Sequence, residues 1–268
     1  TAVLTIIPRV AVGNTSPIIF PGLSHASETV FLFAELSSFC LDFCTRQKIG
    51  GTHLTYGYFK QLPVPPMPIF ERCNPWLTAK QSLRDWFLPR VLELTYTAWD
   101  LEFFAKDCSW SGPPFRWDEG RRFLIRCGLD AAFFHLYLPV EANGDWRPAR
   151  RVDGCPYDET PEQLVELKKY FPTPRDAVAY IMDTFPIVRR KDEEKFDGDY
   201  RTKRVILEIY DAMQESIRTG QPYQTRLDPP PGPPSDEHGN FLSLPEWKPG
   251  QPRPTDWPPH IHPPRGCD

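Results

Sequence analysis

The sequence lacks the features that define several common classes of protein. Its 268 residues contain no run of about eighteen apolar residues, so we expect no transmembrane helix and no membrane contact. No stretch has the pattern of a secretory signal peptide. The formal net charge is −4, which argues against a basic coat over the whole protein. Contact with a nucleic acid would therefore have to come from a local group of cations.

Cysteine pairs spaced for zinc are also absent. The seven cysteines are irregularly spaced and no CxxC occurs, so the sequence predicts no zinc site of the usual spacing and no other metal site. An odd number of scattered cysteines predicts reduced, mostly buried thiols in a cytoplasmic protein. The chain begins at Thr1, within residues that read as a strand, so we expect it to be part of a longer protein.

What is present is enough apolar surface for a substantial core. Hydrophobic residues make up 40% of the chain, with eight Trp, ten Tyr and eighteen Phe. The patterns predict an α+β fold that is predominantly helical, with a small N-terminal β portion, a helical body and an extended Pro-rich C-terminal tail. Residues 2–12 are rich in β-branched side chains and predict a strand, in which Pro8 favours an edge position or a bulge.

Apolar periodicity and helix-start signals predict the helical body. They indicate helices over residues 28–47, 77–88, 89–106, 119–138, 162–170 and 200–218, and another that begins at 173–176. In the first of these, Glu35 and Ser38 fall on the polar stripe. Asp118 is the predicted N-cap of the helix at 119–138, whose wide apolar face predicts a central position.

Three parts are expected along the chain. Residues 1–70 hold the predicted strand and the first predicted helix, residues 71–219 would form a helical domain, and residues 220–268 an extended tail. Fourteen of the 32 prolines fall in this tail, which has too few aliphatic residues to fold alone.

The most informative segment is residues 46–66, RQKIGGTHLTYGYFKQLPVPP. Gly50 and Gly51 predict a turn, and the prolines from Pro63 to Pro66 predict an extended exit. Between them lie hydroxyl, imidazole and ammonium groups that suit base edges and phosphates. The candidate DNA-facing residues are Arg46, Lys48, Thr52, His53, Thr55, Tyr56 and Lys60.

Two further basic groups lie near the last helix. They are Arg189, Arg190 and Lys191, and Arg201, Lys203 and Arg204, on either side of an acidic run interpreted as a solvated loop. Lys203 and Arg204 fall in the first turn of the predicted helix, where the helix dipole disfavours a cation by about 0.3–1 kcal/mol. Two interpretations follow: pairing with the nearby acids, or binding to an external polyanion such as DNA.

Segment 46–66 resembles the C-terminal part of the target-recognition region in adenine-specific DNA methyltransferases of restriction–modification and phage-defence systems. In those proteins a helix, a Gly-rich turn, a polar-aromatic segment and a QLPVPP-like exit follow one another. The resemblance recurs at residues 90–105, 112–122 and 183–211, and covers most of residues 1–219. It implies that this chain recognises double-stranded DNA for an N6-adenine methyltransferase, with or without restriction activity. Residues 1–70 would then be a partial DNA-recognition region, and residues 71–219 a helical spacer or docking domain.

The catalytic motifs of such enzymes are absent. No Gly-rich turn follows a strand to hold a nucleoside cofactor, and Asn74-Pro75-Trp76 lacks the second proline of the motif that holds the flipped adenine. We therefore expect no cofactor in this chain. The resemblance implies that S-adenosylmethionine binds a catalytic region elsewhere in the parent enzyme, which would be a partner of this chain.

Two other classes of function remain open. A helical protein-interaction module could dock onto another subunit of a DNA-modification or defence complex, as the negative charge and wide apolar helix faces favour. An autonomous nuclease is indicated only by a loose match of Asp183 and Glu193-Glu194-Lys195 to the acid and Glu-x-Lys pattern of magnesium-dependent enzymes. Salt dependence separates DNA binding from an apolar protein interface.

Overall fold

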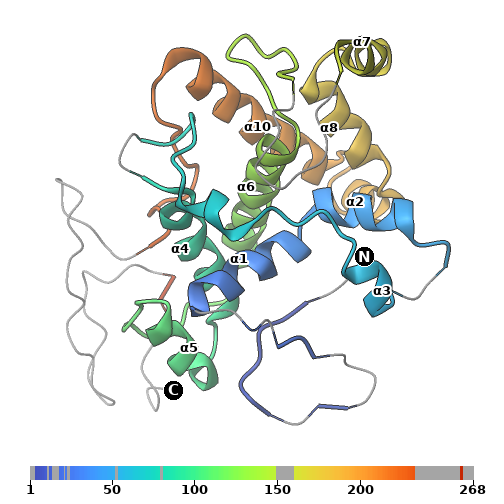
Figure 1. Ribbon diagram of the computed structural model, residues 1–268. Coiled ribbons are helices and arrows are strands. Elements are labelled where there is room, and N and C mark those ends of the chain that lie inside the picture. Colours follow the sequence, from blue (N-terminus) through green and yellow to red (C-terminus); the bar gives the residue numbers. More distant parts are fainter. Residues whose placement is uncertain are drawn as a thin grey trace.

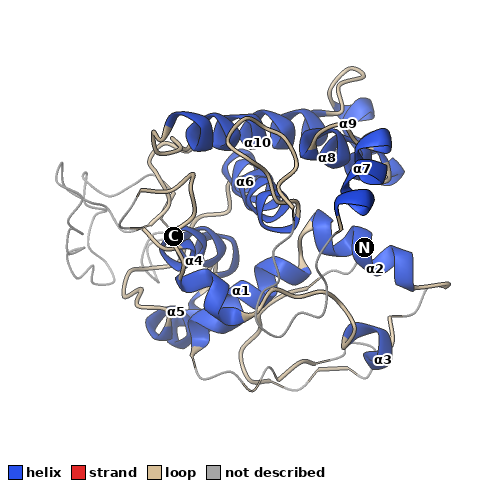
Figure 2. Ribbon diagram, turned by 45° about the horizontal axis from the view of Figure 1, so that its top comes forward, coloured by secondary structure: helices blue, strands red, loops and turns tan. Residues whose placement is uncertain are grey.

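The structure is a computed structural model, and it describes residues 4–10, 12–13, 18–20, 22, 25–51, 54–78, 81–148, 160–232 and 260–261. These residues are predominantly helical, as predicted (Figures 1 and 2). The elements are α1 (Ala26–Leu36), α2 (Phe39–Lys48), α3 (Tyr56–Phe59), η1 (Met67–Glu71), α4 (Leu83–Thr95), η2 (Trp99–Leu101), α5 (Glu102–Asp107), α6 (Glu119–Tyr137), α7 (Pro161–Tyr170), α8 (Pro174–Asp183), α9 (Pro186–Lys195) and α10 (Arg201–Thr219).

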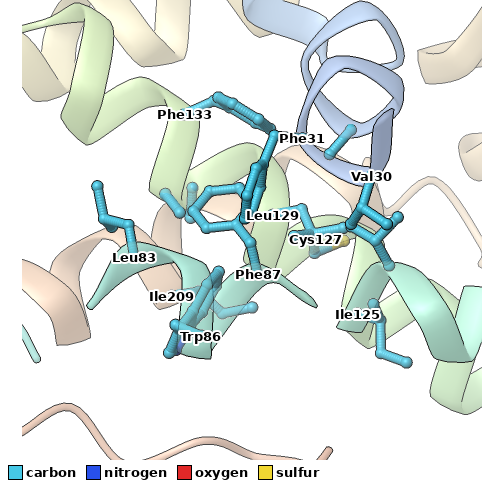
Figure 3. Close-up of a cluster of buried hydrophobic side chains, with 14 of the residues drawn as sticks. Val30, Phe31, Leu83, Trp86, Phe87, Ile125, Cys127, Leu129, Phe133 and Ile209 are labelled. Atoms are coloured by element: carbon cyan, nitrogen blue, oxygen red, sulfur yellow. The ribbon is translucent and has the colours of Figure 1, made fainter. Parts of the chain in front are cut away.

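Helix α6 lies at the centre of the molecule and packs against α10, α4 and α2, while α1 packs against α4 (Figure 1). Every residue from Cys127 to His135 on α6 is buried. Around it lies a group of aromatic rings from α1, η1 and α4, among them Phe31 and Phe87, which Figure 3 shows beside Phe133 of α6. The ring centroids of Phe87 and Phe133 are 5.0 Å apart, and those of Phe31 and Phe70 are 4.3 Å apart. The same hydrophobic core cluster also contains Val30 and Trp76.

The predicted N-terminal strand is not confirmed. Residues 4–10 and 12–13 belong to no helix or strand, and the β pairing among the described residues consists of three isolated bridges. A strand needs a neighbour to accept and donate its backbone hydrogen bonds, and Pro8 has no N–H to donate. Of the predicted tail, residues 220–232 and 260–261 are described, and Leu227 and Ile261 are buried there. The remainder of the tail lies outside the described residues.

The single helix predicted over residues 28–47 is wrong, because the structure divides it into α1 and α2. Ser38 caps α2 by accepting a hydrogen bond from Leu41 N at 3.2 Å, and its hydroxyl donates to Glu35 O at 2.8 Å. Asp130 of α6 accepts a hydrogen bond from Phe39 N at 2.8 Å. The break turns Glu35 and Ser38 inward, so that both residues of the predicted polar stripe are buried.

The predicted boundary at Pro89 is also wrong. Pro89 lies inside α4, and the region to residue 106 is completed by η2 and α5 rather than by one long helix. Proline removes one backbone hydrogen bond from a helix. Here that loss is offset by packing, because Trp86, Phe87, Val91 and Leu92 are all buried on the same helix.

The other predicted helices are confirmed as α6, α7, α8 and α10, with Asp118 accepting from Arg121 N at 2.7 Å as the N-cap of α6. Helix α9 corrects the interpretation of residues 189–199 as a solvated loop for residues 189–195, whereas residues 196–199 follow the helix. An ion pair at 2.7 Å between Arg189 and Glu193, four residues apart, adds modestly to the stability of this helix. No helix among the described residues has the length and apolar character needed to cross a membrane.

The capping boxes of α7 and α8 are alike, so comparing them tests whether a cap stabilises the protein more when its helix is packed in the core. Thr173 and Thr160 each accept a hydrogen bond from the backbone three residues later, and each precedes a proline. Thr173→Ala is expected to lower the free energy of unfolding by about 1 kcal/mol, because α8 buries Val178 and Met182. Thr160→Ala should change it less, since α7 buries no residue and can fray alone. Urea unfolding measures both, and equal losses would contradict the argument.

Candidate nucleic-acid interface

The candidate DNA-facing segment leaves the body at the C-terminal end of α2 and returns at the proline exit. Gly50 and Gly51 follow the helix as a bend with open space around them. Helix α3 is a single turn after Thr55, which has an extended backbone. The exit is extended as the prolines predict, with Pro66 at φ −66° and ψ 141°, and the Tyr137 hydroxyl donates to Pro63 O at 2.7 Å. The proline exit of the segment is therefore held against the C-terminal end of α6.

The side chains of this segment are directed to solvent. Lys48, Thr55 and Lys60 are exposed, and Tyr56 and Tyr58 are 62% and 40% exposed. Lys48 and Lys60 form no ion pair within the part of the chain that the structure describes. The candidates Thr52 and His53 lie outside the described residues. Tyr58 was not among the predicted site residues, although its place two residues after Tyr56 in YGYF was a signal for it.

Arg46 differs from the two lysines because it is engaged by the protein itself. Its Nη2 lies 3.1 Å from Asp42 Oδ2, and its guanidinium carbon lies 4.4 Å from the centre of the Phe185 ring. Nη1 also donates to Thr184 O at 3.5 Å. These contacts hold the end of α2 against the junction of α8 and α9.

The second predicted group is largely neutralised by local acids. Arg189 and Arg190 pair with Glu193 and Glu194 on α9, while Lys203 pairs with Asp183 at 2.7 Å. Arg204 contacts Asp199 at 2.6 Å and Glu208 at 2.9 Å. These hydrogen bonds raise the pKa of Arg204 and lower that of Asp199, while the pKa of Glu208 is lowered first by its bond from Arg226 and then by that from Arg204. Of the two interpretations, the contacts favour local pairing.

Two members of this group have other environments. Arg201 lies between aromatic rings, 4.2 Å from the centre of Phe123 and 4.7 Å from that of Phe196. Lys191 is exposed and has no ion pair among the described residues.

At the start of α10, Asp192 of α9 accepts a hydrogen bond from Thr202 N at 2.5 Å. This carboxylate at the start of α10 offsets the unfavourable placement of Lys203 and Arg204 near the positive end of the helix dipole.

A groove of about 360 Å³ lies beside these cations, between α8 and α10. It is lined by Arg175, Asp199, Tyr200, Lys203, Arg204, Leu207 and Glu208. Arg175, which the sequence patterns did not single out, pairs with Asp211 at 2.6 Å. Acids and bases alternate around the groove, so it presents no continuous positive surface to a polyanion.

Two buried carboxyl groups lie beneath α2, and neither was predicted. Glu35 is 1% exposed, and burial raises its pKa to about 8, although a hydrogen bond from the Tyr137 hydroxyl acts in the opposite direction. Burial also raises the pKa of Asp130 to about 7, against the lowering effect of its bond from Phe39 N. Because the same Tyr137 hydroxyl lies 2.7 Å from Pro63 O, this network connects the core to the exit of the exposed segment.

No protein-family model, no curated protein and no solved structure matches this chain. The part of the chain that the structure describes contains no group of three His, Cys, Asp or Glu side chains arranged to hold a metal ion. In the region compared above with a nuclease pattern, Asp183 and Glu193 are paired with Lys203 and Arg189.

Proposed function

We propose that this chain is the DNA-recognition and positioning part of an adenine-specific N6 DNA methyltransferase of the cytoplasm. A separate catalytic region of the parent enzyme would bind S-adenosylmethionine and transfer the methyl group. The observation that carries the proposal is the exposed segment between Lys48 and Lys60. These two cations have no ion pair with any described residue, and they bracket a Gly-Gly bend and a turn with two exposed tyrosines.

Phosphate contacts position a protein on DNA, and contacts with base edges provide specificity. Lys48 and Lys60 suit the first role, because neither has to give up a carboxylate partner in order to bind phosphate. Thr55 and Tyr56 suit the second, since their hydroxyl groups both donate and accept hydrogen bonds. The second basic group would lose existing ion pairs on binding DNA, so we assign it at most a supporting role through Lys191.

The experiment is fluorescence anisotropy with a mixed-sequence DNA duplex over a series of salt concentrations. The test variant is Lys48→Ala/Lys60→Ala, with Arg46 retained because it holds α2 in place. We expect the wild type to bind at low salt, and the slope of log affinity against log salt to become shallower by about two in the variant. Affinity at low salt should fall roughly tenfold or more, as two phosphate contacts are lost.

A matched control removes two positive charges elsewhere. Lys169→Ala/Arg218→Ala changes exposed cations of α7 and α10, each paired with a glutamate on its own helix, and gives the same net charge as the test variant. Its binding and salt slope should stay close to wild type. Equal losses in both variants, or no wild-type binding at low salt, would count against a DNA surface at Lys48–Lys60.

A second candidate function is protein interaction, favoured by the exposed apolar surface of α7 and α8. Helix α7 buries no residue, and Val165, Tyr170 and Tyr180 are 61%, 71% and 52% exposed. Such a surface would dock onto another subunit of a DNA-modification or defence complex. Association that persists at high salt and is lost in Val165→Ser/Tyr170→Ser would support this function, whereas loss with rising salt would support DNA binding.

A further inference from the structure

The hydroxyl group of Tyr137, at the C-terminal end of α6, lies between two oxygen atoms. One is Oε1 of Glu35, to which it is hydrogen-bonded inside the core. The other is Pro63 O, 2.7 Å away, at the proline exit of the exposed segment. Glu35 is 1% exposed, and its second oxygen, Oε2, is buried without a hydrogen-bond partner among the described residues. The hydroxyl thus joins a buried carboxyl group to the backbone of an exposed residue.

The number of protons decides which of these two contacts can be hydrogen bonds. A tyrosine hydroxyl has one proton to donate, and a backbone carbonyl can only accept. An ionised carboxylate also only accepts, so beside it Tyr137 could donate to Glu35 or to Pro63 but not to both. A protonated Glu35 instead donates its own proton to the Tyr137 oxygen, and Tyr137 then donates to Pro63 O. Both contacts are therefore satisfied only when Glu35 is neutral.

The surroundings of Glu35 favour this neutral form. Burial raises its pKa to about 8, and it has no ion pair within the described ranges. The titratable and charged side chains around this network are Tyr137 and Asp130 of α6 and Cys40, Cys44 and Lys48 of α2. Burial raises the pKa of the tyrosine and of both thiols, so these groups stay neutral as Glu35 titrates. Lys48 acts on Cys44 and Asp130 acts on Cys40, rather than on the Glu35 carboxyl group.

The contact at Pro63 is also the hydrogen bond that ties the exposed segment to the body. Within the described part of the chain, no other hydrogen bond joins residues 54–66 to an α-helix of the body. Those inside the segment are local, such as the bond from Gln61 Nε2 to Gly57 O at 3.0 Å. At the other end, the Gly50–Gly51 bend has open space around it. The hold on this segment therefore depends strongly on one hydroxyl proton.

We propose that Glu35 and Tyr137 form a proton-controlled latch on the exposed segment. With Glu35 protonated, Tyr137 donates to Pro63 O and the latch is closed. When Glu35 loses its proton to solvent, the Tyr137 hydroxyl turns to the carboxylate, because a hydrogen bond to a charged acceptor is the stronger one. Pro63 O then has no donor, and the latch is open. The proline exit is held at neutral pH and is released as the pH rises through about 8. This release does not depend on the proposed DNA binding and applies to any partner of the segment.

Hydrogen exchange of the full chain, without DNA, tests the latch. Glu35→Gln should keep it closed at every pH, because the amide can donate to Tyr137 and does not titrate, whereas Tyr137→Phe should leave it open. At pH 6.5 the amides of residues 54–62 in the wild type should exchange as in Glu35→Gln. At pH 9.5 they should exchange about three- to tenfold faster than in that variant, as in Tyr137→Phe. Comparing proteins at equal pH cancels the intrinsic pH dependence of exchange.

Two controls accompany this comparison. Glu166→Gln removes an exposed carboxylate of α7, and its segment 54–62 should follow the wild type at both pH values. The amides of residues 164–170, on a helix that buries no residue, should exchange alike in wild type and Glu35→Gln. Equal acceleration of residues 54–62 and 164–170 at pH 9.5 would indicate general loosening of the protein and would overturn the proposal.

Two further outcomes would overturn it. One is a wild type that exchanges like Glu35→Gln at pH 9.5, since the latch would then not open. The other is an acceleration at pH 9.5 that persists in Glu35→Gln, which would assign the effect to another group, such as Asp130, whose pKa burial raises to about 7. Both comparisons use only the wild type and Glu35→Gln, so the test does not depend on whether Tyr137→Phe folds.

Discussion

The free energy of unfolding is expected to fall as the pH rises from about 4.5 to about 8, because of Glu35. Burial raises the pKa of this carboxyl group from 4.5 to about 8 in the folded protein. Between these values the folded state holds a proton that the unfolded state has released, so each increase in pH favours unfolding. The stabilising contribution is complete below the unfolded pKa and is lost as pH passes through the folded one. Its size is on the order of 5 kcal/mol.

Glu35→Gln isolates this contribution. Glutamine keeps an oxygen to accept from the Tyr137 hydroxyl but does not titrate, so the variant should be more stable than wild type at pH 8 to 9 and should show a shallower pH dependence. Asp130, whose pKa is raised to about 7, contributes with the same sign and should account for part of the remaining slope. Cys40 and Cys44 also face Glu35, and burial raises the pKa of both thiols.

The matched control is Glu166→Gln on α7, where the carboxylate is exposed and pairs with Lys169. It should leave the pH dependence unchanged. Urea unfolding at a series of pH values gives the free energies. A wild-type curve that is flat from pH 5 to 8, or a Glu35→Gln curve parallel to it, would show that Glu35 is ionised in the folded protein.

Glu93→Ala is expected to lower the free energy of unfolding by about 3–5 kcal/mol, because it would leave Arg121 buried without a countercharge. The two side chains form an ion pair in which they are only 4% and 9% exposed. Arg121 also donates to Pro229 O at 2.8 Å, and His260 approaches Glu93 at 4.0 Å. The loss should therefore include looser attachment of the segment after α10.

A double variant distinguishes the cost of an unpaired charge from the value of the pair. Glu93→Met/Arg121→Met removes both charges while keeping volume, and should be far less destabilised than Glu93→Ala, close to wild type. Chemical denaturation compares the three proteins. A double variant as unstable as the single one would mean that the packing and hydrogen bonds of these side chains, and not the unpaired charge, dominate.

The local conformation of the proposed DNA-facing segment could be predicted from the sequence. The glycines, the polar-aromatic turn and the prolines are consecutive, and the structure shows a bend, the single turn α3 and an extended exit. The sequence could not show which of its cations are available to bind a phosphate. Arg46 and Lys48 are alike in sequence, but only Arg46 lies where Asp42 and Phe185 engage it.

By itself the sequence determined those elements whose cause lies within a few residues. The starts of α6, α7 and α8 follow from Asp118, Thr160 and Thr173, whose side chains each bond a backbone N–H three positions later. The amphipathic pattern of α10 likewise placed its apolar face in the core. Such interactions repeat along the chain at a fixed spacing, so they can be recognised without knowing the fold.

The tertiary structure alone decided what depends on partners distant in sequence. The break between α1 and α2 is completed by Asp130, 91 positions from Phe39, and Lys203 is neutralised by Asp183, 20 positions away. The burial of Glu35 and of Glu93 likewise depends on distant parts of the chain. The free energy of burying each ionisable group depends on which groups the fold places around it, and no local spacing encodes that arrangement.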